Sequence, residues 1–376
     1  MPRPILAKIH TNALRSNLLR VKAASPDSKV WAVIKANAYG HGICRVFEGL
    51  KGADGFALLD LEEAQTLRDL GWRGPILLLE GAFELRDLEL CSRLGLWHTV
   101  HCEAQIDMLA AHKTNIGHRV FLKMNTGMNR LGFPPQNYRS AWVRLNALPQ
   151  VEEVSLMTHF SDADGPGGVQ TQMKLFSQYS QDLPGERCLS NSAATLRHSH
   201  RPNTTPENAW VNSDWVRPGV ALYGSSPDFP LNSASHWGLK PAMSLTSKVI
   251  AIQTLQSGDS LGYGGTFIAP KVIRIGIAAC GYADGYPRSC GTNTPVLING
   301  QWSRLLGRVS MDMVALDLSL LDEKGHTADI GAEVVLWGES NSGQTLSIDE
   351  VAHHAGTVGY ELMCGLAPRV PVQVID

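Results

Sequence analysis

The sequence predicts a (β/α)8 TIM-type barrel followed by a mainly β domain. Three observations lead to this prediction: eight apolar runs separated by helix-like stretches, a change of sequence texture after Gly224, and a length of 376 residues. A single hydrophobic core usually stops growing near ~250–300 residues, so two domains are expected. We place the barrel at residues 1–230 and the mainly β domain at 231–376, and the first ten or so residues are able to pair with the second domain.

The predicted barrel strands are short, continuous apolar runs. They lie at residues 30–36, 54–60, 75–80, 96–101, 118–124, 151–160, 187–191 and 214–224. Helix-like stretches separate them; in one of these, apolar residues at helical spacing run from Leu61 to Leu70 and end at Gly71. Apolar strands that alternate with helices are typical of a parallel sheet covered on both faces. Eight such units favour a closed barrel over an open doubly wound sheet.

After Gly224 the sequence changes character. Residues 225–242 are rich in Ser, Pro and Asn and indicate a connection between domains. Short β-type runs separated by turn residues follow, which predicts a mainly β domain. Residues 347–356 are typical of a single helix, with Ser347 and Glu350 forming a capping box. Two polar stretches, 162–186 and 200–213, are expected to be surface loops.

The composition excludes several classes of function. The formal net charge is −2 and there is no basic run, which argues against a nucleic-acid-binding surface. The first apolar stretch is too short for a signal peptide, and no stretch approaches the ~20 apolar residues that span a bilayer. The seven cysteines are scattered and never spaced as CxxC. This pattern indicates a reducing compartment and no structural zinc, so a cytoplasmic enzyme without a metal is expected.

Lys35 directly follows the apolar residues of the first predicted strand. In a barrel of this kind, chemistry collects at the carboxyl ends of the strands and in the loops after them. Desolvation by apolar neighbours lowers the pKa of a lysine amine, and the neutral amine is the form that attacks an aldehyde. A strand-end lysine alone is more often structural, but the polar and small residues that follow at 37–42 favour a functional site.

The segment AVIKANAYGHG (32–42) resembles the signature of bacterial alanine racemases, in which the lysine carries pyridoxal phosphate. Eight further segments resemble the same family, in the same order and at similar spacing. They are FLKMNTGMNRLGF (121–133), MTHF (157–160), SNSAATL (190–196), DWVRPGVALYG (214–224), LGYGGTF (261–267), CGYADGYPR (280–288), GRVSMDMVALDL (307–318) and GTVGYELMCGL (356–366). The resemblance implies a fold-type III isomerase, with pyridoxal 5'-phosphate as a Schiff base on Lys35.

The cofactor's phosphate requires hydroxyls and backbone N–H groups. Barrels commonly supply them after strands seven and eight, where Ser192 and Gly219 lie. The resemblance implies phosphate contacts from Ser192, Gly219 and Val220, and hydroxyls from Tyr39 and Tyr360. From the residues alone, a serine after a strand is usually an ordinary turn residue.

Arg217 is the most informative of the expected cofactor residues. The resemblance places it beside the ring nitrogen, and an arginine there leaves that nitrogen unprotonated, because arginine cannot accept a proton. The ring is then a weaker electron sink, which suits a reaction in which the proton returns quickly. The resemblance also places His159 against the ring face. From the residues alone, Arg217 could pair with a carboxylate, and His159 could be a hydrogen-bonded core residue.

Racemisation moves a proton from one face of Cα to the other, and two opposing bases achieve this directly. Lys35 is expected to serve one face. The resemblance implies that Tyr263 serves the other, and that it comes from the second subunit of a homodimer. By itself the YGG sequence is more often a turn with a packed tyrosine.

The substrate carboxylate calls for a fixed positive group, and arginine provides bidentate geometry. The resemblance implies that Arg130 and the backbone near Met311 bind the substrate. It also implies supporting roles for Lys123, which is carbamylated in several relatives, and for Asp312, although an Asp at such a position is often a turn former.

The function predicted from this resemblance is interconversion of L- and D-alanine, for peptidoglycan synthesis or for alanine catabolism. Three alternatives stay open. One is a broad-specificity amino-acid racemase, and another is a decarboxylase on the same two-domain plan, which usually carries an acid at the ring nitrogen. The third is a non-enzymatic carrier of pyridoxal phosphate, against which the second domain argues.

Overall fold

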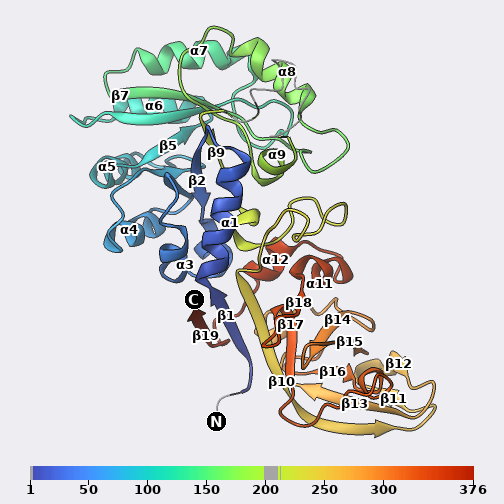
Figure 1. The fold of residues 1–376 in the computed structure, drawn as a ribbon. Helices are drawn as coiled ribbons and strands as arrows, with labels where there is room; N and C mark the ends of the chain where they lie inside the picture. The colour runs from blue at the N-terminus through green and yellow to red at the C-terminus, as the bar shows by residue number, and fades with distance from the viewer. Residues whose placement is uncertain (1–2, 199–210, 212) are drawn as a thin grey trace. The chain divides into compact units, whose positions relative to one another are not determined.

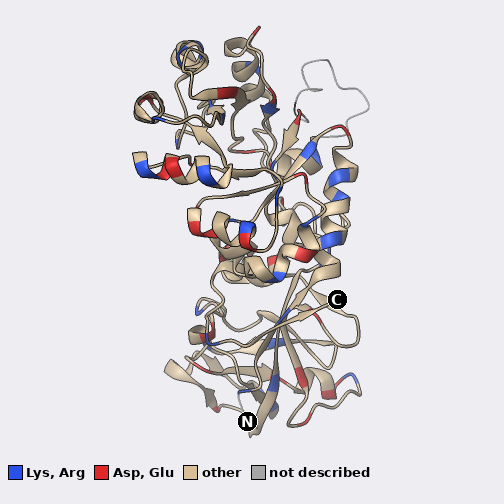
Figure 2. Cartoon of the chain, turned by 90° about the vertical axis from the view of Figure 1, so that its left-hand side faces the viewer, with Lys and Arg blue, Asp and Glu red and all other residues tan. Residues whose placement is uncertain are grey.

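The computed structural model describes residues 3–198, 211 and 213–376. The chain divides into two compact units, which are described separately below (Figure 1). The barrel unit holds Arg15–Ala38 and Gly42–Leu222. The β unit holds the chain up to Leu14, the short stretch Tyr39–His41, and Tyr223–Asp376. Basic and acidic residues are scattered over the chain, and several helices carry both (Figure 2), in keeping with the small net charge.

The barrel unit contains a closed barrel of eight parallel strands. They are β2 (Lys29–Val33), β3 (Gly55–Leu58), β4 (Ile76–Leu78), β5 (Trp97–Val100), β6 (His118–Lys123), β7 (Val151–Met157), β8 (Arg187–Cys188) and β9 (Trp215–Val216). The last strand pairs with the first, Lys29 opposite Trp215 and Val30 opposite Val216, and this closes the barrel. Each strand lies within or beside one of the eight predicted apolar runs, so the predicted fold class is confirmed.

Helices alternate with these strands. They are α1 (Thr11–Ala24), α2 (Lys35–Tyr39), α3 (Ile43–Leu50), α4 (Leu61–Asp69), α5 (Leu85–Leu94), α6 (Glu103–Ala111), α7 (Pro135–Asn146), α8 (Gln170–Tyr179) and α9 (Ser192–Arg197). The prediction of a loop over 162–186 is wrong at α8, where Met173 and Phe176 are buried in the core. These two apolar residues at helical spacing are the signal that was missed. Most of the second predicted loop, 200–213, lies outside the described residues.

The β unit is built on a nine-stranded sheet with the order β18-β17-β14-β15-β16-β13-β10-β1-β19. Its strands are β1 (Leu6–His10), β10 (Met243–Leu255), β13 (Ile273–Ala278), β14 (Pro295–Ile298), β15 (Gln301–Leu306), β16 (Val314–Asp317), β17 (Glu333–Glu339), β18 (Thr345–Leu346) and β19 (Val372–Ile375). The N-terminal strand β1 lies between β10, to which it is antiparallel, and β19, to which it is parallel. A small hairpin is formed by β11 (Ser260–Leu261) and β12 (Phe267–Ile268).

Short helices complete the β unit: α10 (Ser319–Asp322), α11 (Ile348–His354) and α12 (Gly359–Cys364). The residues predicted as a connection, 225–242, belong to the β unit, where the Ser226 amide donates to Oδ2 of buried Asp349 at 2.8 Å. The predicted cap of α11 is present, because Ser347 Oγ accepts from the Asp349 amide. In a capping box the Glu350 carboxylate would also accept a hydrogen bond from the Ser347 amide. The described contacts include no such bond, so the predicted capping box is wrong.

Four aromatic rings fill the barrel interior toward the amino ends of the strands. Trp31 stacks on Trp215 with ring centroids 4.1 Å apart, and its ring edge meets Trp97 at 5.5 Å. Phe121 lies 6.0 Å from Trp97. This aromatic core occupies the end of the barrel opposite to Lys35 and Lys123.

A group of histidines lies on the outer face of β5 and β6. His98 Nε2 is 3.1 Å from His118 Nδ1, and the Ser92 hydroxyl is within hydrogen-bonding distance of both His112 and His118. Burial and the neighbouring histidines lower the pKa of His98 to about 3, and burial and His112 lower the pKa of His118 to about 4. Both rings are therefore neutral in the folded protein above these values.

These lowered pKa values predict a loss of stability in mild acid. The unfolded chain takes up protons near pH ~6.5, so as pH falls from there towards 4 protonation favours the unfolded state. For His118 the effect is about 2 kcal/mol at about pH 5. Between about pH 7.5 and about pH 5 the free energy of unfolding should fall in both proteins. In His118→Gln the fall should be smaller by about 2 kcal/mol, as measured by urea unfolding. An identical pH dependence in the two proteins would show that His118 is not held neutral by the fold.

Candidate active site

Lys35 begins α2 one residue after β2 ends, and α2 is a left-handed turn instead of a right-handed helix. Ala36, Asn37 and Ala38 have φ angles of 54°, 50° and 54°, and Tyr39 continues the turn at 52°. Left-handed helical geometry costs roughly 1–2 kcal/mol per non-glycine residue, and such strain persists mainly at functional sites. Lys35 is half-buried. The strained turn fixes where the chain goes immediately after this lysine.

Hydrogen bonds around Asn37 hold this turn. The Gly42 amide donates to the Asn37 carbonyl at 2.9 Å, and the Ile43 amide donates to Asn37 Oδ1 at 3.1 Å. The Asn37 amide donates to Glu63 Oε1 at 2.6 Å. Burial raises the pKa of Glu63, although this hydrogen bond opposes the shift. Glu63 was not predicted from sequence, because nothing in α4 distinguishes it from an ordinary helix-surface glutamate.

Four positively charged residues lie at or after the carboxyl ends of the barrel strands: Lys35, Lys123, Arg130 and Arg217. Burial and the charges of Arg217, Arg130 and Lys35 lower the pKa of Lys123 to about 8, and Glu80 opposes them. We call Lys35, Lys123, Arg130 and Arg217 the cation cluster. Like charges held together in this way destabilise one another, and an anion bound among them relieves the repulsion. The cation cluster is therefore suited to a ligand that carries phosphate or carboxylate.

Arg217 is buried, and neutral oxygen atoms hold its guanidinium. It donates to the carbonyls of Cys188 and Thr158 at 2.7 and 2.8 Å. Among the residues that the structure describes, no carboxylate forms an ion pair with it, so the carboxylate-paired interpretation of this arginine is not supported. Carbonyls orient the guanidinium without neutralising it, and its positive charge stays available to a ligand.

His159 lies against Arg217. Burial and then the charges of Arg217 and Lys123 hold the pKa of His159 far below its usual range, so the ring is neutral. Arg217 Nη2 lies 3.3 Å from His159 Nδ1. Because the guanidinium can only donate, Nδ1 accepts, and the ring proton belongs on Nε2.

Ser192 supplies a hydroxyl beside backbone amides. Its Oγ accepts from the Gly219 amide at 2.9 Å and from the Ala221 amide at 3.4 Å. Asn191 caps α9 by accepting from the Ala194 amide at 2.9 Å, which fixes the backbone at Ser192. Ser192, Gly219 and Val220 thus lie together, as a phosphate site requires. The Ala221 amide was not predicted.

Two predicted tyrosines lie together in the β unit. Tyr39 is buried, and its ring centroid lies 6.0 Å from that of Tyr360. Tyr223 stacks on Tyr39 at 4.6 Å and orients the ring, a role that the sequence did not reveal. Burial and the neighbouring Tyr360 raise the pKa of Tyr39, so its hydroxyl stays protonated and can donate a hydrogen bond.

Tyr263 and Met311 are the most exposed of the apolar and aromatic side chains in the predicted set, and Tyr360 follows at 38%. Tyr263 is 74% exposed and lies on a turn, η2 (Tyr263–Gly265), preceded by Gly262 with a φ of 69°. Met311 is 52% exposed. Among the described residues, Tyr263 has no hydrogen bond or ring contact with another predicted site residue.

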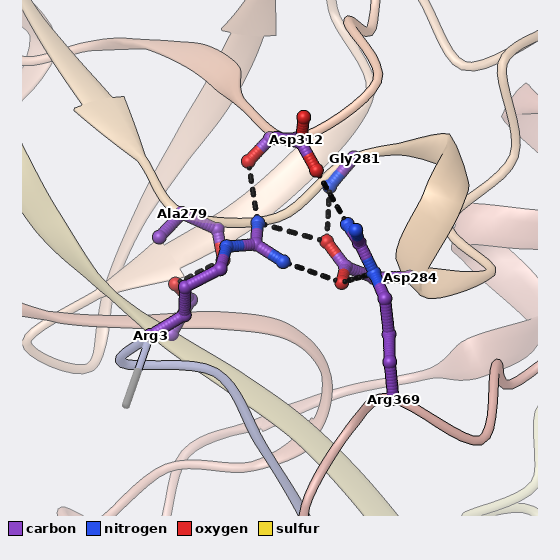
Figure 3. A network of polar contacts seen from close by, with 7 residues as sticks. Arg3, Ala279, Gly281, Asp284, Asp312 and Arg369 are labelled. Atoms are coloured by element: carbon purple, nitrogen blue, oxygen red, sulfur yellow. Dashed lines mark hydrogen bonds and ion pairs between the residues drawn. The ribbon is translucent and has the colours of Figure 1, made fainter. Parts of the chain in front are cut away.

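A buried carboxylate fixes the loop that carries Met311 and Asp312. Asp284 accepts from Arg3 at 2.7 Å, from Arg369 at 2.7 Å and from the Gly281 amide at 2.9 Å (Figure 3). Arg369 also forms an ion pair with Asp312 at 2.6 Å. Burial raises the pKa of Asp284, but the hydrogen bonds from the two arginines and Gly281 outweigh it and hold this pKa below its usual range.

The Met311 loop is also held by its backbone. The Met311 carbonyl accepts from the Ala283 amide at 3.0 Å, and the Ser310 carbonyl accepts from the Tyr282 amide at 3.0 Å. Gly281 allows this close approach, because a Cβ there would lie 2.3 Å from the carbonyl oxygens of Ser310 and Met311. The segment CGYADGYPR was noted in the sequence, yet nothing in it linked Asp284 to residues 3 and 369.

Asp284→Asn should destabilise the β unit. The substitution keeps the shape of the side chain but removes the charge that pairs with two arginines, and we expect a loss of about 1–3 kcal/mol in the free energy of unfolding. Urea unfolding at neutral pH measures this loss. Because the folded pKa of Asp284 is depressed, its contribution is present above pH ~4 and disappears as pH falls through the folded value. The variant and the unsubstituted protein should therefore converge in acid, and a constant difference would contradict this explanation.

Comparisons with known proteins identify the family of this chain. Residues 9–227 match the family model of the alanine racemase N-terminal domain, and residues 242–374 match that of the C-terminal domain. The chain belongs to the alanine racemase family. An alanine racemase from Albidiferax ferrireducens is 68% identical over 376 residues, which is 100% of both chains.

Solved structures of similar fold extend this finding. The biosynthetic alanine racemase from Pseudomonas aeruginosa has a TM-score of 0.90 and 42% identity, with 100% of each chain covered. A histidine racemase from Leuconostoc mesenteroides has a TM-score of 0.81 and 27% identity, covering 100% of this chain and 98% of that one. Alanine racemases are pyridoxal-phosphate-dependent isomerases, so the predicted family and enzyme class are confirmed. In the part of the chain that the structure describes, no helix is both long and apolar enough to cross a membrane.

Proposed function

We infer that this chain interconverts L- and D-alanine, with pyridoxal 5'-phosphate bound at the carboxyl ends of the barrel strands. Arg217 supports this inference most directly. It is a buried arginine held by carbonyls, it lies within the cation cluster, and it has no acidic partner among the described residues. A decarboxylase of the same plan usually carries an acid at the ring nitrogen, and Arg217 argues against that alternative.

The residues present fit this cofactor. Lys35 would hold it through its amine, Ser192, Gly219 and Val220 would contact its phosphate, and the cation cluster would offset its negative charge. We further propose, on the family resemblance, that Tyr39 and Tyr360 add their hydroxyls to the phosphate. When bound, the cofactor withdraws electrons from the substrate's Cα and so acidifies its proton.

Arg217 and His159 would set the polarity around the cofactor ring. Arg217 donates only, so a ring nitrogen beside it can accept a hydrogen bond but gains no proton. His159 is neutral and can pack against the ring without adding charge. This environment favours rapid return of the proton to Cα over longer-lived side reactions.

We propose that Lys35 Nζ and Tyr263 Oη exchange the proton on opposite faces of Cα. Tyr263 would come from the other subunit of a homodimer. Its exposure of 74% supports this proposal, because a side chain that acts in another subunit must project from its own. The described part of the β unit offers Tyr263 no acidic or basic hydrogen-bond partner, so a tyrosine acting as a base would depend on groups beyond its own turn.

The substrate carboxylate would bind Arg130, with Met311 supplying a backbone contact and Asp312 holding the Met311 loop through Arg369. Lys123 lies near Arg130, and its pKa of about 8 leaves an appreciable fraction as the neutral amine, the form that reacts with carbon dioxide. A carbamate on Lys123 would replace repulsion of Arg130 by attraction.

A cytoplasmic location stays a prediction, as does the use of D-alanine in peptidoglycan synthesis.

Tyr263→Phe tests the two-base proposal. Removing one hydroxyl should lower kcat by about 10²–10⁴-fold in both directions. Exchange of the α-hydrogen with deuterated solvent should survive for the enantiomer that Lys35 deprotonates and be lost for the other. Tyr179→Phe, at the end of α8, is a matched control that should leave both rates unchanged. Equal exchange from both enantiomers in Tyr263→Phe would remove Tyr263 from the mechanism.

Substrate preference is tested with a panel of L-amino acids and chiral detection of product. Alanine should be turned over with the highest kcat/KM, because relatives that are 68% and 64% identical to this chain are alanine racemases. The histidine racemase of similar fold makes a broader specificity the second candidate. Turnover of histidine, lysine or arginine with none of alanine would overturn the proposed substrate.

A further inference from the structure

A hollow lined by arginines lies at the other end of the barrel from the cation cluster. Its volume is about 480 Å³, and Arg68, Arg73, Arg93 and Arg119 lie around Trp97 in its wall. Trp97 is the first residue of β5 and Arg119 the second of β6, so this arginine hollow lies at the amino ends of the strands. Lys35 and Lys123 lie at the carboxyl ends, and the arginine hollow is thus separate from the proposed active site.

Two of its arginines are held rigidly by the fold. Arg68 donates from Nε to the Leu94 carbonyl at 2.9 Å, from Nη1 to the carbonyls of Trp72 and Gly74 at 3.0 and 2.8 Å, and from Nη2 to the Gly95 carbonyl at 3.2 Å. Its positive charge is kept, but most of its N–H groups are used. Arg119 lies 5.2 Å above the Trp97 ring and forms ion pairs with Glu152 at 3.0 Å and Glu153 at 3.6 Å, which offset its charge. Their positions are fixed before any ligand arrives, which reduces the entropy lost on binding.

The other two arginines are exposed and lack acidic partners. Arg73 donates to the Arg68 carbonyl at 3.0 Å, and in the described part of the chain neither Arg73 nor Arg93 forms an ion pair with a carboxylate. Among the described residues that line the hollow none is acidic, and two glutamates outside it, Glu152 and Glu153, pair with Arg119. Burial chiefly, and then the charge of nearby Arg73, lower the pKa of Arg68.

We propose that the arginine hollow binds a small diphosphate-type anion. Guanidinium groups match phosphate oxygens in bidentate pairs, and Arg73 and Arg93 are the two arginines of the hollow that can do so. Two such groups, beside the uncompensated charge of Arg68, favour an anion with more than one charged group. Arg119 covers one part of the Trp97 ring, and Phe121 stacks near it at 6.0 Å. The ring is thus already packed, so recognition depends on charge and not on an aromatic group of the ligand.

Trp97 makes this binding observable. It belongs to the aromatic core with Trp31 and Trp215, whose rings lie 5.5 and 5.9 Å from its own. A charged ligand beside Trp97 changes the electrostatic surroundings of its indole, so tryptophan fluorescence should respond on binding. This proposal does not depend on the racemase function and is tested separately from it.

The test uses the cofactor-loaded enzyme titrated with inorganic pyrophosphate, inorganic phosphate and sulfate at constant ionic strength. Calorimetry and tryptophan fluorescence should both show saturable binding, tightest for pyrophosphate. The double variant R73Q/R93Q should bind pyrophosphate at least ~10-fold more weakly. Both arginines are exposed, so racemase activity and the melting temperature should stay unchanged and confirm that the variant is folded.

Arg86→Gln provides the matched control. Arg86 lies on α5, the helix that also carries Arg93, but it does not line the hollow, and its side chain is 77% exposed. It should bind pyrophosphate like the unsubstituted enzyme. The proposal is overturned if R73Q/R93Q retains full affinity, since the anion then binds elsewhere. An affinity for pyrophosphate no greater than that for sulfate, or no saturable binding at millimolar concentration, overturns it as well.

Discussion

The first and last strands of the barrel, β2 and β9, meet in two register pairs, Lys29 with Trp215 and Val30 with Val216. The contact continues where the Val33 amide donates to the Pro218 carbonyl at 3.1 Å. This closure brings the loop after β2, which begins at Lys35, to the same end of the barrel as Arg217. The cation cluster depends on it, because residues from the beginning and the end of the barrel sequence meet only if the sheet closes.

The barrel divides its interior between two kinds of chemistry. The aromatic core of Trp31, Trp97, Phe121 and Trp215 packs toward the amino ends of the strands, and the charged groups lie at the carboxyl ends. Desolvation against packed apolar side chains makes mutual repulsion within the cation cluster stronger than it would be in water. The lowered pKa of Lys123 and the neutral His159 both follow from this arrangement. A phosphorylated cofactor and a carboxylate substrate supply the charge that balances it.

Much of the fold could be predicted from the sequence, because barrel strands buried on both faces are continuous apolar runs of recognisable length. Lys35, Ser192 and Arg217 could be singled out because they stand at or after such runs. The left-handed turn at 36–39 could not, since Ala and Asn give no sign of positive φ angles. The Asp284 network joins residues 3, 284, 312 and 369, which no local pattern connects. Helix α8 was missed because its polar residues concealed Met173 and Phe176.

Two lysines of the cation cluster, Lys35 and Lys123, compete for the role of cofactor lysine on physical grounds. The pKa of about 8 makes the Lys123 amine reactive, whereas Lys35 begins the strained turn that marks a functional position. Borohydride reduction of the cofactor-loaded protein followed by peptide mapping decides between them. We expect a single pyridoxyl adduct on Lys35, in the peptide that contains residues 32–42. An adduct on Lys123, or on no lysine of the barrel, would contradict it.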